Sequence, residues 1–119
     1  MTQFDTFDRR ATQWAREAFG NTVVDNQRER AARFIEEAIE LAQAVDLVEE
    51  EVVDIAYSVY CKPMGEVAQE IGGTMVTLGV LTRIMQLDLE TCAEKELLRC
   101  HAKIQDIRER NKNKKSYLR

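Results

Sequence analysis

The segment spanning residues 67–87 limits the folds open to this chain more than any other. Its only charged residues are Glu70 and Arg83, and on a helical wheel its apolar residues point in every direction. A helix of this kind must be covered by protein, since Arg83 interrupts the run before it could cross a membrane. The other helices of a chain of 119 residues do not easily supply this cover. We therefore expect part of the segment to be buried between subunits, in a homodimer or a dimer of dimers.

Helical patterns account for almost the whole chain. Only one proline occurs, and no stretch alternates β-branched and polar residues as a strand would. The sequence therefore predicts an all-α fold of four to five helices, with a single domain over residues 1–110 and a basic, disordered tail over residues 111–119. The expected helices span residues 6–19, 25 or 26–45, 46–60, 63–86 and 88–110.

Residues with strong preferences for helix ends set these boundaries. Gly20 is placed to end the first helix, and Asp88 to cap the last one. Asp46 followed by Glu49 predicts a capping box at the start of the third helix, and Pro63 suits the first turn of the fourth.

The charge balance excludes several classes of protein. The net charge of −4 argues against a general binder of nucleic acid or of anionic membranes, because both need a dominant basic surface. The first ten residues contain acids where a signal peptide would have a cationic start and an apolar stretch, so we expect a cytoplasmic protein. Three cysteines without CxxC spacing indicate neither a disulfide framework nor a zinc site.

Acidic residues cluster in the segment RFIEEAIELAQA. Glu37 and Glu40 are three residues apart and Glu36 and Glu40 four apart, so these carboxylates share one sector of a helix. A solvated acidic face with ion pairs to Arg30 and Arg33 would explain the cluster without any function.

Glu70 favours a functional interpretation of these acids. A carboxylate within an apolar helix needs a cation, several hydrogen bonds or a proton, and the glycines Gly72 and Gly73 suggest close approach of another backbone or of a ligand. Acids on two helices with no histidine beside them indicate oxygen ligation of a hard divalent cation, Mg²⁺ or Mn²⁺. The chemistry such an ion supports is hydrolysis of a phosphate ester or a phosphoanhydride.

Two segments resemble a known family. RFIEEAIELAQA resembles the EExxE helix of the MazG-like nucleoside triphosphate pyrophosphohydrolases, and KPMGEVAQEIGGTMVTL is similar to a later segment of that group. The resemblance covers roughly residues 26 to 110. It implies a helical bundle of the all-α NTP pyrophosphatase type, packed within an oligomer. It also implies Mg²⁺-dependent hydrolysis of a nucleoside triphosphate to the monophosphate and pyrophosphate.

The resemblance assigns candidate residues by position. Glu37 and Glu40 match the metal-binding pair of the first motif, with Glu36 as the preceding acid, and Glu70 matches the glutamate of the family's ExxD motif. Gly73 stands where that motif has its aspartate, which favours a catalytically weak or regulatory relative as an alternative. A literal ExxD ends at Asp54, which is therefore a rival ligand to Glu70.

The basic end of the chain is the remaining candidate. We expect Arg108, Lys112 and Lys115 to contact substrate phosphates, because a triphosphate near acidic clusters needs cationic groups to balance its charge. A solvated tail that serves only solubility is the alternative. A plain helical interaction protein is the third interpretation of the whole chain.

Overall fold

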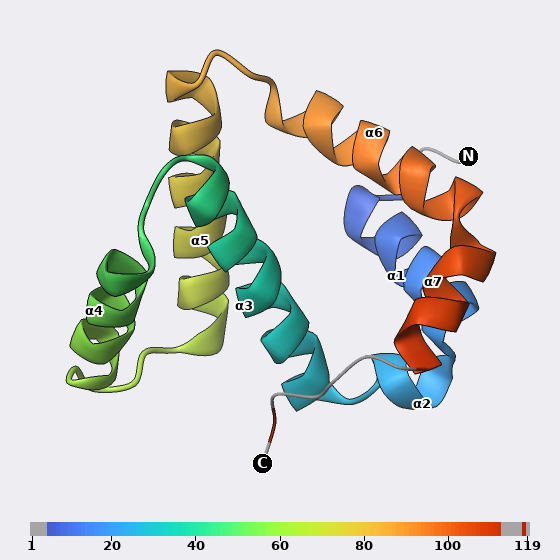
Figure 1. The fold of residues 1–119 in the computed structure, drawn as a ribbon, viewed down its shortest axis with the longest axis horizontal. Coiled ribbons are helices and arrows are strands. Elements are labelled where there is room, and N and C mark those ends of the chain that lie inside the picture. The colour runs from blue at the N-terminus through green and yellow to red at the C-terminus, as the bar shows by residue number, and fades with distance from the viewer. Residues whose placement is uncertain (1–4, 113–117, 119) are drawn as a thin grey trace. The chain divides into compact units, whose positions relative to one another are not determined.

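The structure, a computed structural model, describes residues 5–112 and Leu118. Within these residues the chain forms seven α-helices and no strand (Figure 1), which confirms the all-α prediction. The helices are α1 (Phe7–Phe19), α2 (Asn21–Val24), α3 (Gln27–Ala44), α4 (Glu49–Tyr60), α5 (Val67–Ile84), α6 (Leu89–Ala102) and α7 (Ile104–Lys112). None of the helices is both long and apolar enough to cross a membrane in the part of the chain described. The predicted disordered tail lies outside the described residues, apart from the end of α7 and Leu118.

Three predicted helix ends are confirmed. Thr6 caps α1 by accepting a hydrogen bond from the backbone N–H of Arg9, at 3.4 Å. Gly20 ends α1 with φ of 87°, a conformation that side chains with a Cβ disfavour, and its N–H donates to the carbonyl of Arg16. Asp88 caps α6 through a hydrogen bond from the N–H of Thr91 to Oδ2, at 2.9 Å.

Two helices end in the same left-handed turn, although neither has a glycine there. After α3, Asp46 has φ of 72°, and the N–H of Leu47 donates to the carbonyl of Ala42 at 3.0 Å. After α5, Gln86 has φ of 61°, and the N–H of Leu87 donates to the carbonyl of Thr82 at 3.0 Å. Both are Schellman motifs, which satisfy carbonyls at the end of a helix.

Two predicted helix starts are wrong. Asp46 ends α3 and does not open α4. Instead Glu51 Oε1 accepts from the N–H of Val48 at 2.9 Å. Pro63 precedes α5, which begins only at Val67 because Glu66 caps it by accepting from the N–H of Ala68, at 2.9 Å.

The described chain has more helices than predicted. The short α2 follows Gly20 directly, and the expected helix 88–110 is interrupted at Lys103, which has φ of −120° and ψ of 24°. No proline or glycine stands at Lys103, so the sequence offers no strong local signal for that break. The bundle type and the packing within an oligomer stay predictions.

The chain divides into two compact units. The terminal unit is drawn from Met1–Ala32 and Asp88–Arg119 and holds α1, α2, α6 and α7. The central unit, Arg33–Leu87, holds α4, α5 and most of α3. The prediction of one domain over residues 1–110 stays a prediction.

The terminal unit has a small core centred on α1. This helix packs against α2, α6 and α7, and the packing buries Ala18 and Leu97, which are 4% and 7% exposed. Trp14 meets Phe19 edge to face, with ring centroids 5.6 Å apart, and the guanidinium of Arg30 lies over the Phe19 ring. Aromatic and cation–π contacts thus supplement a modest apolar core.

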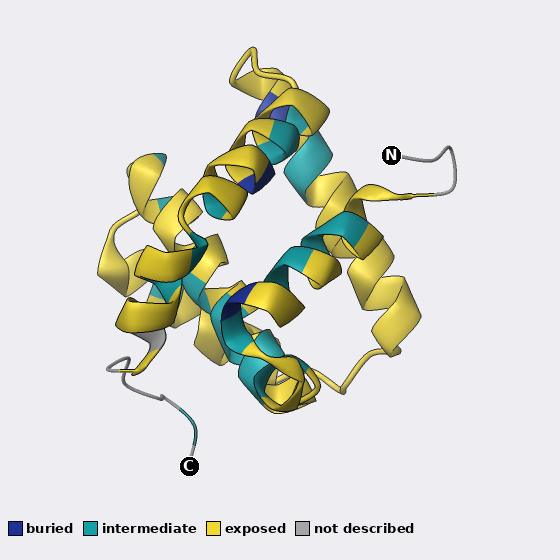
Figure 2. Cartoon of the chain, turned by 90° about the vertical axis from the view of Figure 1, so that its right-hand side faces the viewer, coloured by how far each residue is buried: buried dark blue, intermediate teal, exposed yellow. Residues whose placement is uncertain are grey.

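The central unit leaves its apolar side chains exposed. Its only buried residue is Thr82, and exposed positions cover most of the described helices in Figure 2. Along α5, Ile71, Val76 and Ile84 are 65%, 68% and 76% exposed. The expectation that protein surrounds this helix is therefore wrong for the single chain, because α3, α4 and α5 do not pack closely against one another within the described residues.

Candidate functional site

The acidic cluster of the first motif lies on α3, within the central unit. The side chain of Asn26 accepts a hydrogen bond from the N–H of Glu29 at 3.1 Å, and the helix then runs through Glu36, Glu37 and Glu40 as predicted. Glu37 and Glu40 are exposed. Glu36 is half-buried and pairs with Arg33, one turn earlier, with Nη1 3.6 Å from Oε1. Part of the cluster is thus the ion-paired helix face expected without any function.

Glu70 lies in the first turn of α5 and not inside a buried helix. Its N–H donates to the carbonyl of Glu66 at 3.0 Å, and its side chain is exposed. A negative charge is favourable there, because the N-terminal end of a helix carries a partial positive charge. The helix therefore tolerates this carboxylate without a metal or a buried partner, and the expectation that protein encloses it is wrong for the single chain.

Gly65 leaves room for the Glu70 side chain. A Cβ atom added at Gly65 would overlap the carboxylate group of Glu70, so the missing side chain leaves room for it to turn back over the N-terminal end of α5. By contrast, a Cβ added at Gly72 or Gly73 would meet no atom within 4 Å. Packing within the described chain therefore does not explain these two glycines.

The five candidate metal ligands are distributed over three helices of the central unit. Glu36, Glu37 and Glu40 lie on α3, the rival Asp54 is exposed on α4, and Glu70 is on α5. Within residues 5–112 and Leu118, no three acidic, histidine or cysteine side chains come close enough to hold a metal ion. Exposed carboxylate oxygens suit Mg²⁺ or Mn²⁺ chemically, but the single chain does not gather them, so the metal centre stays a prediction.

The basic residues expected to contact phosphate belong to the terminal unit. Arg108 on α7 donates from Nε and Nη2 to the carbonyl of Glu17, at 3.1 and 2.5 Å, and so fastens α7 to the end of α1. Lys112 is exposed and pairs with Glu109 at 3.4 Å. Lys115 lies outside the described residues. The phosphate-binding role of these residues stays a prediction.

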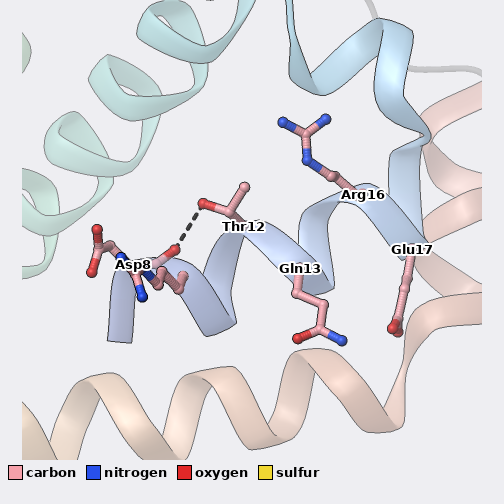
Figure 3. Close-up of a pocket in the computed structure, with 6 residues that line it drawn as sticks. Asp8, Thr12, Gln13, Arg16 and Glu17 are labelled. Atoms are coloured by element: carbon pink, nitrogen blue, oxygen red, sulfur yellow. Dashed lines mark hydrogen bonds between the residues drawn. The ribbon is translucent and has the colours of Figure 1, made fainter. Parts of the chain in front are cut away.

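One hollow of the terminal unit follows α1. It has a volume of about 510 Å³ and is lined by Asp8, Arg9, Thr12, Gln13, Arg16 and Glu17. In Figure 3, Thr12 and Arg16 point to one side of the helix and Gln13 and Glu17 to the other. Thr12 Oγ1 donates to the carbonyl of Asp8, and Arg16 pairs with Asp25 at 2.9 Å. Thr12 and Arg16 are thus engaged by other groups of the terminal unit.

A second hollow, of about 330 Å³, lies between α1 and α6, and Arg10 and Glu94 line it. The two form a two-point ion pair that holds the helices together, with Nη1 2.7 Å from Oε1. The hydrogen bond from Arg10 is the main reason why the pKa of Glu94 lies below its ordinary value, and burial opposes it. Sequence reasoning missed this pair because its members are 84 residues apart and neither belongs to a motif.

Comparison with known proteins adds no relative. No protein-family model matches the chain, and neither a curated protein nor a solved structure shows significant similarity to it.

Proposed function

We propose that the chain is a Mg²⁺-dependent hydrolase of nucleoside or deoxynucleoside triphosphates, which releases the monophosphate and pyrophosphate, and that it belongs to the MazG-like family. The observation that carries the proposal is the acidic face of α3. Glu37 and Glu40 stand one turn apart on a formed helix with exposed side chains, and Glu70 belongs to the same compact unit. We place the enzyme in the cytoplasm.

Each residue has a defined part in this proposal. Glu37 and Glu40 would hold Mg²⁺ or Mn²⁺, with Glu36 beside them and either Glu70 or Asp54 as a further ligand. When bound, the ion neutralises phosphate charge and activates water. The ion pair with Arg33 restrains the Glu36 side chain, and Gly65 leaves room for Glu70 to turn back over the start of α5. The site needs a rearrangement or a second subunit to bring the α5 acid to the α3 acids.

Two alternatives follow from particular observations. Gly73, in place of the family aspartate, favours a catalytically weak nucleotide-binding or regulatory relative. The exposed apolar side chains of α4 and α5 favour a plain helical interaction protein.

Pyrophosphate release from a panel of nucleoside triphosphates, with and without Mg²⁺, tests the proposal. We expect release from at least one triphosphate only when the ion is present, and loss of release in Glu37→Gln and Glu40→Gln. Glu90→Gln, which removes an exposed acid from α6, serves as the matched control and should retain the activity. Nucleotide binding without hydrolysis would favour the regulatory alternative, and absence of both would favour the interaction protein.

A further inference from the structure

Gly65 stands where the backbone does not require a glycine. Of the glycines in the chain, only Gly20 has a positive φ, the conformation that residues with a Cβ atom disfavour. Gly65 lies two residues before α5 and outside any helix, so close packing between helices does not account for it either. What a side chain at residue 65 would contact is therefore the informative question.

A side chain at residue 65 would first meet the side chain of Glu70. A Cβ atom added there would overlap Oε2 of Glu70 and would lie 2.9 Å from its Cδ and 3.2 Å from its Cγ. Carbon atoms that are not bonded to each other rest about 3.5–4.0 Å apart, so Cδ would have to move away by about 0.5–1 Å. Because the carboxylate is the far end of a flexible, exposed side chain, the movement would change the position of the charge far more than the stability of the fold.

The structure of the helix end does not explain why the Glu70 carboxylate lies beside Gly65. Glu66 already caps α5 by accepting a hydrogen bond from the N–H of Ala68, at 2.9 Å. Glu70 takes part in the helix through its backbone, whose N–H donates to the carbonyl of Glu66 and whose carbonyl accepts from Thr74 Oγ1. The position of the carboxylate is thus not set by a role in capping the helix.

We propose that Gly65 is a positioning residue of the metal site, because it leaves the space in which the Glu70 carboxylate lies at the start of α5. The proposal rests on the hydrolase assignment, in which Glu70 is a candidate ligand of Mg²⁺ or Mn²⁺. A ligand atom must lie within about 0.2 Å of its ideal distance from the ion. The movement that a Cβ at residue 65 would force on Glu70 is larger than this tolerance.

Binding of Mn²⁺ alone, measured by isothermal titration calorimetry without nucleotide, tests this role. Gly65→Ala should weaken Mn²⁺ binding by at least about 10-fold, as is typical when a residue that orients a metal ligand is replaced. Gly79→Ala is the matched control on α5, because a Cβ added at Gly79 would meet no atom within 4 Å. The control should keep the wild-type affinity within about twofold. Circular dichroism should show that neither variant has lost helix.

A second substitution separates an effect through Glu70 from a general effect on the structure. In a Glu70→Gln background, Gly65→Ala should cause no further loss of Mn²⁺ affinity, because the charge that it displaces is already absent. An equal loss in both backgrounds would overturn the proposal, since Gly65 would then act on another part of the protein.

The position of the side chain can also be measured without metal. Nuclear magnetic resonance of the metal-free protein should show a nuclear Overhauser contact between Hα of Gly65 and Hγ of Glu70, and its absence would overturn the proposal. If wild type binds Mn²⁺ and Gly65→Ala binds it equally well, the positioning role fails and the hydrolase assignment is unaffected. If wild type binds no Mn²⁺ at millimolar concentration, both fail.

Discussion

Arg10 and Glu94 join the first helix of the chain to the sixth through two parallel hydrogen bonds, Nη1 to Oε1 at 2.7 Å and Nη2 to Oε2 at 2.5 Å. Two-point pairing of this kind is stronger and more directional than a single contact between charges. It places an arginine–carboxylate clamp between two helices that pack against each other in the terminal unit, where Leu97 of α6 is buried.

Glu94→Gln should lower the urea midpoint of unfolding at pH 7. The folded state lowers the pKa of Glu94 from its ordinary value of 4.5, so the stability that the charge contributes is present above about that pH and is lost as the pH falls through the folded pKa. The difference between wild type and variant should therefore shrink between pH 5 and pH 3. Glu96→Gln, which breaks an exposed pair with Arg99 inside α6, should shift the midpoint less. A difference that stays constant with pH would show that the charge of Glu94 is not responsible.

Magnesium should stabilise the protein if the acids of the central unit bind it. An ion at ten times its dissociation constant contributes about 1.4 kcal/mol, and in a domain of this size a gain of this order raises Tm by about 4–8 °C. Glu37→Gln, Glu40→Gln and Glu70→Gln should each reduce the gain, and Glu90→Gln should leave it unchanged. Differential scanning calorimetry with and without millimolar Mg²⁺ measures this effect. If wild type gains nothing and Glu70→Gln is more stable than wild type, the carboxylate is structural and the enzyme assignment fails.

Deletion of residues 111–119 should raise the KM for a triphosphate several-fold and leave kcat within about threefold, the pattern of lost uniform binding. The positive charges removed include Lys112 and Lys115, whereas Arg108 keeps its contact with the Glu17 carbonyl. Deletion of residues 113–119 alone retains Lys112. Comparison of the two deletions therefore distinguishes the contribution of residues 111–112 to KM from that of residues 113–119. An unchanged KM would show that the tail is solvated and does not contact the substrate. A large loss of kcat in a variant that still folds would show that the tail stabilises the transition state.

Gln86→Gly should raise the free energy of unfolding by about 0.5–1 kcal/mol, because the left-handed conformation costs more for a residue with a Cβ than glycine loses in entropy on folding. Asp46→Gly, in the equivalent turn after α3, should give a gain of similar size. As a control, Gln43→Gly in the exposed last turn of α3 should lower the free energy of unfolding by about 0.5–1 kcal/mol. Urea unfolding of the three variants decides the matter. If all three variants lose the same free energy of unfolding, the two turns are not strained.

The sequence predicts the helices well where their ends are set by neighbouring residues. Thr6 and Asp88 cap helices with their side chains, and Gly20 ends one through its backbone freedom. Each contact lies within one helical turn, so the residue type alone indicates the helix end. The start of α5 was missed because Glu66 and Pro63 are both plausible starts, and only the structure shows which one is used. The break at Lys103 lies between two helices that each pack against α1, and no local sequence pattern marks it.

The candidate site was predicted only in part. Helical spacing correctly placed Glu36, Glu37 and Glu40 on one helix, because that relation is local. The role of Glu70 was inferred from the hydropathy of its neighbours, and hydropathy indicates that a surface needs cover but not what covers it. The contacts of Arg10 and Arg108 span 84 and 91 residues, and single-residue patterns carry no information on such pairs.

Because α1 packs against α6 and α7, the core of the terminal unit cannot form until both of these later helices have been synthesised. The ion-pair partner of Arg10, Glu94, and the residue that binds the Glu17 carbonyl, Arg108, are synthesised 84 and 91 residues after the α1 residues they contact. The core around Ala18 and Leu97 therefore closes only after α6 and α7 have been synthesised and the entropy of a long loop has been overcome. Until then the nascent chain displays α4 and α5 with their apolar side chains, and neighbouring ribosomes on one message would bring two such chains together before either has finished folding.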